Sequence, residues 1–227
     1  MNFLKKINKK YNHLKFYNFD QRKIKKHNFD NSKNYLIISP HPDDELLYSS
    51  AVLLSSKKNV TVMCFSHGDK HSIRSNEFLK LMNILNLQDS KIFNYDEGDM
   101  VNYDLEIDYL KYDYIFVPNF FNSHFDHYKF HLGFKDVISK INYKGLICQY
   151  EDNGTLPFPN YYMDIGNIVE KKFHFFKKYY KSQYLISSSF ADSIKALNFY
   201  RGKLAGVMYA EFFTFFSKKE YLKFIND

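Results

Sequence analysis

Cysteine, glycine and proline are scarce in this chain of 227 residues, which contains two, eight and five of them. The two cysteines, Cys64 and Cys148, lie in apolar runs, which favours buried thiols in a reducing compartment over a disulfide framework or a Cys-based metal site. Ordinary hydrophobic and charged contents, 45% and 25%, exclude a disordered or collagen-like chain. A chain of this length suits one large domain with its own hydrophobic core.

Long apolar runs are also absent, and the longest fall far below the roughly 20 residues that span a bilayer. The N-terminus reads Met-Asn-Phe-Leu-Lys-Lys, but no apolar stretch of signal-peptide length follows it. These features predict a soluble protein that is not transmembrane and that stays in the cytoplasm.

The net charge of +7 is concentrated at one end of the chain. Residues 1–33 carry ten Lys and Arg against two Asp, a net of +8, whereas residues 34–227 are almost balanced. We therefore divide the chain into a basic N-terminal extension, 1–33, and one folded domain, 34–227. A solvated extension is the favoured interpretation, and the alternative is a patch for nucleic acid, an anionic membrane surface or an anionic glycan carrier.

From residue 35 onward, short β-type runs alternate with helical patterns. Apolar runs rich in β-branched and aromatic residues predict strands at 35–39, 60–65, 91–95, 114–118 and 145–150. Helical spacing of apolar residues predicts helices near 46–54, 78–85, 127–141, 167–180 and 191–203. This alternation predicts βαβ units around a mostly parallel sheet, in an α/β fold with a single domain.

Polar side chains crowd the segments that directly follow two of these strands. In an open α/β sheet, functional sites lie beyond the carboxyl ends of the strands. The first segment, 39–45, reads Ser-Pro-His-Pro-Asp-Asp-Glu, and the second, 119–127, ends in His-Phe-Asp-His. The rule therefore predicts that these two segments meet at one edge of the sheet.

Three consecutive carboxylates, Asp43 to Glu45, follow His41 in the first segment. Such carboxylates repel one another unless a positive charge lies nearby, and a divalent cation would supply that charge. Simple capping of the next helix is the alternative, but it accounts for one carboxylate and not for the histidine.

The second segment places two histidines, His124 and His127, around Asp126. Two imidazoles and one carboxylate are a common set of ligands for catalytic zinc, with another position left for water. The spacing of the two segments therefore favours a metal site over structural histidines.

The motifs His41-Pro-Asp-Asp-Glu45 and His124-x-Asp-His127 resemble those of the PIG-L/LmbE-like family of zinc-dependent N-acetylglucosaminide deacetylases. Arg74-x-x-Glu77, which follows the second strand, and the stretch from Arg201 to Phe213 add to the resemblance, which spans about residues 35–216. The resemblance implies a Rossmann-like, three-layer α/β fold.

The resemblance also implies a metal cofactor and a set of catalytic groups. The ligands of a zinc ion (Zn²⁺), or of Fe²⁺ in the same site, would be His41, Asp44 and His127. Asp43 would be the general base, and His124 would stabilise the oxyanion and help to protonate the leaving amine. Asp126 would orient His124 and favour its charged form.

Substrate contacts are implied for four further residues: Arg74, Asp96, Glu97 and Asn122. Some members of the family have a tyrosine two residues before the first histidine of the second motif. This chain has Asn122 there, whose amide can also donate a hydrogen bond to the developing oxyanion.

The leading hypothesis is a hydrolase that removes the acetyl group from an N-acetylated amino sugar or sugar conjugate, releasing acetate and a free amine. The positive charge of the basic extension favours a substrate on a phosphate-bearing carrier. No specific nucleic acid is expected. One alternative is a non-haem iron oxygenase with a His41-x-Asp43 and distant histidine triad, which we expect on an all-β fold. The other is a non-catalytic binding module with a basic arm.

Overall fold

The structure is a computed structural model that describes residues 24–55, 59–67, 71–87, 89–96, 98, 107–122, 124–152, 154–186 and 188–226. The predictions made for Glu97 and for residues 1–23 of the basic extension lie outside these ranges.

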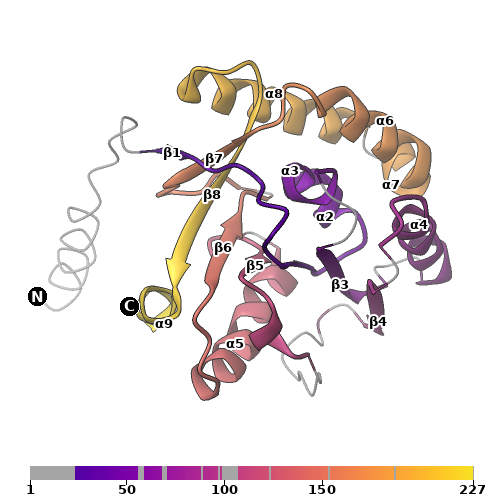
Figure 1. The fold of residues 1–227 in the computed structure, drawn as a ribbon. Helices are drawn as coiled ribbons and strands as arrows, with labels where there is room; N and C mark the ends of the chain where they lie inside the picture. Colours follow the sequence, from indigo (N-terminus) through magenta and orange to yellow (C-terminus); the bar gives the residue numbers. More distant parts are fainter. Residues whose placement is uncertain are drawn as a thin grey trace, which may run out of the picture.

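Eight strands form one sheet in the described part of the chain (Figure 1). Their order across the sheet is β1 (Lys25–Lys26), β7 (Tyr161–Asp164), β8 (Ala210–Ser217), β6 (Leu146–Tyr150), β5 (Tyr114–Val117), β2 (Tyr35–Ser39), β3 (Val60–Ser66) and β4 (Lys91–Tyr95). β8 is antiparallel to its neighbours β6 and β7, and the other neighbouring strands are parallel. The mostly parallel sheet is confirmed, as are the five predicted strands to within one residue at each end.

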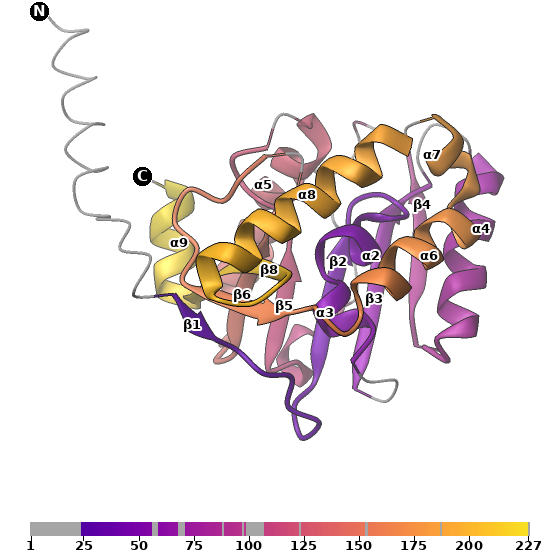
Figure 2. The same cartoon turned by 90° about the horizontal axis from the view of Figure 1, so that it is seen from above.

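Helices cover both faces of the sheet, so the predicted three-layer α/β fold is confirmed (Figures 1 and 2). One face is covered by α2 (Asp44–Tyr48), α3 (Ser50–Leu53), α4 (His71–Ile84), α6 (Val169–Tyr179), α7 (Lys181–Ile186) and α8 (Ser188–Ala205). The other face is covered by α5 (Phe125–Lys140), α9 (Lys218–Asn226) and the 3₁₀ turn η2 (Tyr109–Lys111). This architecture differs from the all-β fold expected for the oxygenase alternative.

The central strands read as continuous apolar runs because both of their faces are buried. In β2, Tyr35 and Ile37 pack into the core beneath α2 and α4, while Leu36 and Ile38 pack into the core beneath α5. Cys64 and Cys148 are buried free thiols, as their apolar surroundings predict.

The predicted helix near 46–54 is divided into α2 and α3 at Ser49. The carboxylate of Glu211 on β8 accepts hydrogen bonds from the amides of Ser50 (3.2 Å) and Ala51 (2.9 Å). These two N–H groups begin α3, and a buried carboxylate that binds them stabilises a new helix start at this point. The apolar periodicity carries no sign of this break, because its cause lies 160 residues away.

Glu211 also neutralises the fully buried ammonium of Lys172, whose Nζ lies 2.8 Å from a Glu211 oxygen. We expect Glu211→Ala to lower the free energy of unfolding by about 3–5 kcal/mol, because it leaves a buried charge unpaired. Urea unfolding measures this loss. The control Glu170→Ala breaks an exposed pair with Lys195 and should cost under about 1 kcal/mol. Equal losses in the two variants would contradict a stabilising role of the buried pair.

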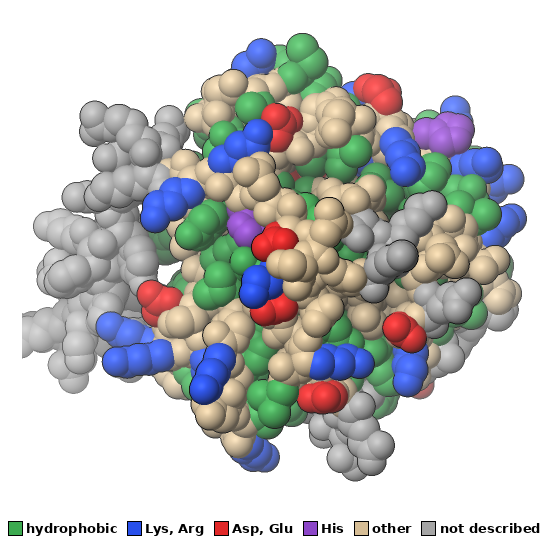
Figure 3. Space-filling model, in the orientation of Figure 1, with side chains coloured by type: hydrophobic (Ala, Val, Ile, Leu, Met, Phe, Trp, Pro, Cys, Tyr) green, Lys and Arg blue, Asp and Glu red, His purple; other side chains and the backbone are tan. Residues whose placement is uncertain are grey.

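Charges of both signs are interspersed on the face of the molecule in Figure 3, in line with the near-balanced charge of residues 34–227. β1, which lies in the last part of the predicted basic extension, pairs with β7 at the edge of the sheet. Among the described helices, none has the length and apolar character needed to cross a bilayer.

Candidate metal centre

The carboxyl ends of three adjacent strands, β2, β5 and β6, bring the candidate residues together. Segment 39–45 follows β2, and segment 119–127 follows β5, its immediate neighbour in the sheet. β6 lies on the other side of β5 and ends directly before Glu151 and Asp152. Residues about 85 positions apart in the sequence therefore meet at one edge of the sheet.

His41, Asp44 and His127 form a close triangle of ligand atoms at this edge. His41 Nδ1 lies 3.2 Å from His127 Nε2, and Asp44 Oδ2 lies 3.6 Å from the former and 3.3 Å from the latter. Two ligand atoms that are each about 2.0–2.1 Å from a tetrahedral zinc ion are about 3.3–3.4 Å apart. The triangle therefore has the size that a zinc ion requires.

The hydrogen bonds of the two imidazoles allow the facing nitrogens to bind a cation. His127 Nδ1 lies 2.6 Å from Asp152 Oδ2, and His41 Nε2 lies 3.3 Å from Asp126 Oδ2. When each of these nitrogens carries the ring proton and donates a hydrogen bond to the carboxylate, the ring is neutral. The other nitrogen of each ring then presents a lone pair. Two lone pairs and the carboxylate of Asp44 then converge, and a cation between them removes their repulsion. The donor set thus fits a divalent metal.

The electrostatics of the triangle also favour a bound cation. Burial disfavours the charged form of His127, but Asp44 and Asp152 overcome this effect and raise the pKa of the imidazole to about 10. Burial likewise disfavours the carboxylate of Asp44, yet His127 and His41 hold its pKa well below the usual range. Carboxylates therefore make this pocket strongly favourable for positive charge.

His124 contributes a third imidazole beside the triangle. His41, His124 and His127 each have one ring nitrogen that lies within 4.8 Å of the corresponding nitrogens of the other two. This set is looser than the triangle that contains Asp44. Burial, together with the nearby His41 and His127, lowers the pKa of His124, which differs from the charged form expected from the sequence.

Asp43 lies next to the triangle, and its carboxylate has no capping role. It precedes α2 with φ 114°, and its side chain makes no capping hydrogen bond to the helix within the described chain. The simple capping alternative therefore does not hold for Asp43. Burial raises the pKa of Asp43, and the charge of Arg74 opposes this effect.

Arg74 lies beneath the first motif. Its guanidinium donates to the carbonyl of Pro42 (2.9 Å) and lies 3.4 Å from Asp43 Oδ2. The residue is buried, with an exposed fraction of 7%. These contacts hold the segment that carries Asp43, and the substrate contact that the resemblance implies for Arg74 stays a prediction.

Asp126 hydrogen-bonds to His41 and accepts the amide of Gly98 at 2.8 Å. Among the described residues it has no hydrogen bond to His124, the partner expected from the sequence. Because Asp126 lies one turn before Phe130 on the buried side of α5, its carboxylate reaches across to the first motif. Asp126 thus lies at the same edge of the sheet as the first motif and hydrogen-bonds to His41, whereas the resemblance implies that it orients His124.

The remaining predicted substrate contacts are spread around the site. Asn122 Oδ1 accepts a hydrogen bond from the amide of His124 at 2.6 Å, and its Nδ2 lies 3.1 Å from His127 Nδ1. Because that ring nitrogen donates to Asp152, the contact with His127 is one of proximity only. Asp96 is exposed and pairs with His67 at 3.1 Å.

Glu45, the third consecutive carboxylate, faces away from the triangle. It accepts hydrogen bonds from Ser39 Oγ (2.9 Å), from the amide of Asp43 (3.2 Å) and from the hydroxyl of Tyr180. Burial raises its pKa to about 7. Glu45 therefore ties the first motif to the sheet and to the C-terminal end of α6, a role that differs from that of the two aspartates before it.

Asp152 is the main site residue that is not in the set predicted from the sequence. Fully buried, it accepts both His127 Nδ1 and the amide of Asn119. The signal was present, because Asp152 follows the end of β6 just as the two motifs follow β2 and β5. Its Asn-Gly continuation, typical of a turn, obscured it.

Removing the Asp152 carboxylate should weaken metal binding. We expect Asp152→Ala to lower zinc affinity about 10–100-fold, because a carboxylate that fixes the tautomer of a histidine ligand typically contributes that much. Competition with a chromogenic chelator measures the affinity. Asp136→Ala, on the exposed side of α5, is the control and should leave it unchanged. Unaltered zinc affinity in Asp152→Ala would show that His127 is not oriented by this carboxylate when metal binds.

Three solved structures illustrate the fold that this chain shares. N,N'-diacetylchitobiose deacetylase from Pyrococcus horikoshii is similar with a TM-score of 0.67 at 20% identity, over 97% of this chain and 95% of that one. The conserved protein TT1542 from Thermus thermophilus gives 0.64 at 21% identity, over 80% and 94%. The zinc-inhibited form of teicoplanin deacetylase Orf2 gives 0.59 at 14% identity, over 80% and 97%. The chain thus has the fold of LmbE-like deacetylases.

A family model described as PIG-L, GlcNAc-PI de-N-acetylase, matches residues 36–138. This segment contains both the 41–45 and the 124–127 motifs, and the match confirms the resemblance to the PIG-L/LmbE-like family. No protein with a curated description matches the chain.

Proposed function

We propose that this protein is a metal-dependent N-deacetylase that hydrolyses the acetamide of an N-acetylated amino sugar. The observation that carries this proposal is the triangle of His41, Asp44 and His127 with the carboxylate of Asp43 beside it. The match to the PIG-L family model over the same segment supports it.

The metal would be held by His41, Asp44 and His127, and we favour zinc because two imidazoles and a carboxylate suit it. Iron(II) fits the same donors. A divalent ion in such a site polarises the amide carbonyl and makes water a stronger nucleophile at neutral pH. We prefer Asp44 to His124 as the third ligand because its oxygen completes the tighter triangle.

Asp43 would act as the general base. It accepts a proton from the attacking water as the oxygen of that water bonds to the acetyl carbon. Arg74 lies against one oxygen of the carboxylate and holds the segment in place. The other oxygen of the carboxylate would then be the one that takes the proton from the water.

His124 would lie opposite Asp43 and donate a hydrogen bond to the carbonyl oxygen as negative charge develops on it. The tetrahedral adduct breaks at its C–N bond, the proton held by Asp43 passes to the departing nitrogen, and acetate and a free amine result. Asn122 fixes the backbone of His124 and so its approach to the substrate.

The family-model match and the name of one similar structure support an amino-sugar substrate. GlcNAc-PI de-N-acetylase and diacetylchitobiose deacetylase are both named for acetylated amino sugars. We infer an N-acetylglucosamine derivative, and the basic residues of 1–33 favour one on a phosphate-bearing carrier.

A screen for acetate release tests the proposal. We expect the zinc-loaded protein to release acetate from at least one N-acetylglucosamine conjugate, chelation to abolish the release, and added zinc to restore it. The panel should contain free N-acetylglucosamine, nucleotide-linked, lipid-linked and oligosaccharide forms. Acetate release that persists unchanged after complete removal of metal would contradict the proposed mechanism.

A further inference from the structure

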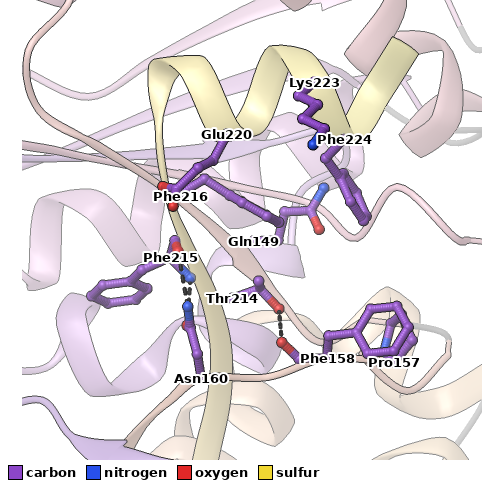
Figure 4. A pocket seen from close by; sticks show the side chains of 10 residues that line it. All are labelled: Gln149, Pro157, Phe158, Asn160, Thr214, Phe215, Phe216, Glu220, Lys223 and Phe224. Carbon is purple, nitrogen blue, oxygen red and sulfur yellow. Dashed lines mark hydrogen bonds between the residues drawn. The ribbon is translucent and has the colours of Figure 1, made fainter. Parts of the chain in front are cut away.

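A cavity of about 290 Å³ lies between β6, β8, α9 and residues 157–160, away from the candidate metal ligands (Figure 4). Gln149 and Thr214 are directly opposed on the antiparallel strands β6 and β8, so their side chains share one face of the sheet. Aromatic side chains line several other sides of the cavity, among them Phe158, Phe216 and Phe224. The charged residues Glu220 and Lys223 also belong to its lining.

Gln149 carries a buried amide without a partner. The residue is 1% exposed, and its Nε2 has no hydrogen-bond partner within the described parts of the chain. Buried donors are nearly always paired in folded proteins, so each exception calls for an explanation. Figure 4 shows the amide extended among the cavity walls, towards Phe224.

Two other neutral polar side chains of the cavity already have hydrogen-bond partners. Thr214 Oγ1 donates to the carbonyl of Phe158 at 3.2 Å. Asn160 exchanges hydrogen bonds of 2.9 and 2.8 Å with the backbone of Phe215. These hydrogen bonds fix residues 157–160 against β8. The unpaired Nε2 of Gln149 lies beside the cavity that this segment lines.

Aromatic rings define the shape of a fitting ligand. Phe216 and Phe224 lie with ring centroids 5.0 Å apart at an interplanar angle of 34°, and Phe158 lies on another side of the space (Figure 4). Aromatic walls favour a flat ring, which packs face or edge against them. A single buried donor favours a ring that carries a carbonyl acceptor.

We propose that this cavity is a second ligand site, which binds a small planar cyclic amide of the pyrimidine-base type. The ring would pack between Phe158 and Phe224, and a ring carbonyl would accept a hydrogen bond from Gln149 Nε2. Pockets that bind small molecules have this composition, largely apolar walls with a few placed polar groups. The site needs neither the metal nor deacetylase activity.

Titration of the full chain with uracil tests the proposal. Binding is followed by the ¹H–¹⁵N signal of the Gln149 side-chain amide in the parent, and by the backbone amide signal of Thr214, which lines the same cavity, in the parent and in both variants. We expect a saturable shift of both signals in the parent. Gln149→Leu keeps the approximate volume but removes the donor, and should weaken uracil affinity about tenfold or more, which corresponds to about 1.4 kcal/mol. Because it also removes an unpaired buried amide, it should fold at least as stably as the parent. Gln149→Glu, which replaces the donor with an acceptor, should also lose affinity.

Benzene serves as the probe without an acceptor and should bind Gln149→Leu at least as well as the parent. Equal uracil affinity in the parent and both variants would overturn the proposal, because binding would then not use the amide. The absence of a saturable shift would also overturn it, since the cavity would then hold water only. Zinc content and acetate release play no part in these measurements, so their outcome is separate from that of the deacetylase proposal.

Discussion

Asp43→Asn should reduce acetate release by about 10²–10⁴-fold while leaving the zinc content at the parental value. The amide of asparagine keeps the size of the side chain and its place against Arg74, but it cannot take a proton from the attacking water. Asp43 is not part of the triangle of ligand atoms, so the metal should remain. Initial rates on the best substrate of the screen and metal analysis of the same samples measure both effects.

Asp136→Asn, an exposed change on α5, is the matched control and should alter neither value. A parental rate in Asp43→Asn would show that another group is the base. A rate that falls together with the zinc content would instead make Asp43 a ligand and would overturn the division of roles between Asp43 and Asp44.

His127→Ala should lose nearly all bound zinc and, with it, acetate release. The imidazole supplies one corner of the triangle, and its removal also leaves the buried carboxylates of Asp44 and Asp152 facing one another without the ring between them. Two remaining ligands do not make a stable site for catalytic zinc, which typically has three from the protein. Metal analysis after dialysis against a weak chelator measures the loss.

His124→Ala is the decisive comparison for this prediction. It should keep zinc and lose rate, because we assign the third ligand position to Asp44 rather than to the third imidazole. Loss of zinc from His124→Ala, with retention in Asp44→Asn, would favour the set of three imidazoles. Full zinc occupancy in His127→Ala would contradict both sets.

The parts of the fold that could be predicted are the central strands, which are buried on both faces of the sheet. Strands such as Tyr35–Ser39 read as apolar runs because both faces are covered, and this signal is local. The division of α2 from α3 is not local, because it depends on Glu211 from β8. The antiparallel strand β8 and its neighbour β7 also escaped prediction, since they lie outside the regular strand–helix alternation that revealed the other strands.

For the site, too, one part could be predicted from the sequence and another could not. Its location follows from the rule that chemistry gathers at the carboxyl ends of parallel strands, and both motifs lie there. The partners of individual side chains depend on three-dimensional reach, which the sequence does not contain. Asp126 therefore hydrogen-bonds to His41 rather than to His124, and Arg74 lies against Asp43. Asp152 reaches His127 from the end of a third strand, β6.

Calorimetric titration of zinc into the metal-free chain tests the central claim most directly, because it requires no knowledge of the substrate. The two motifs, joined at one edge of the sheet, should bind one zinc ion per chain, and His41→Ala and His127→Ala should each abolish that binding. Binding that persists at one ion per chain in both variants, or no saturable binding in the parent, would contradict a shared metal centre built from these two segments.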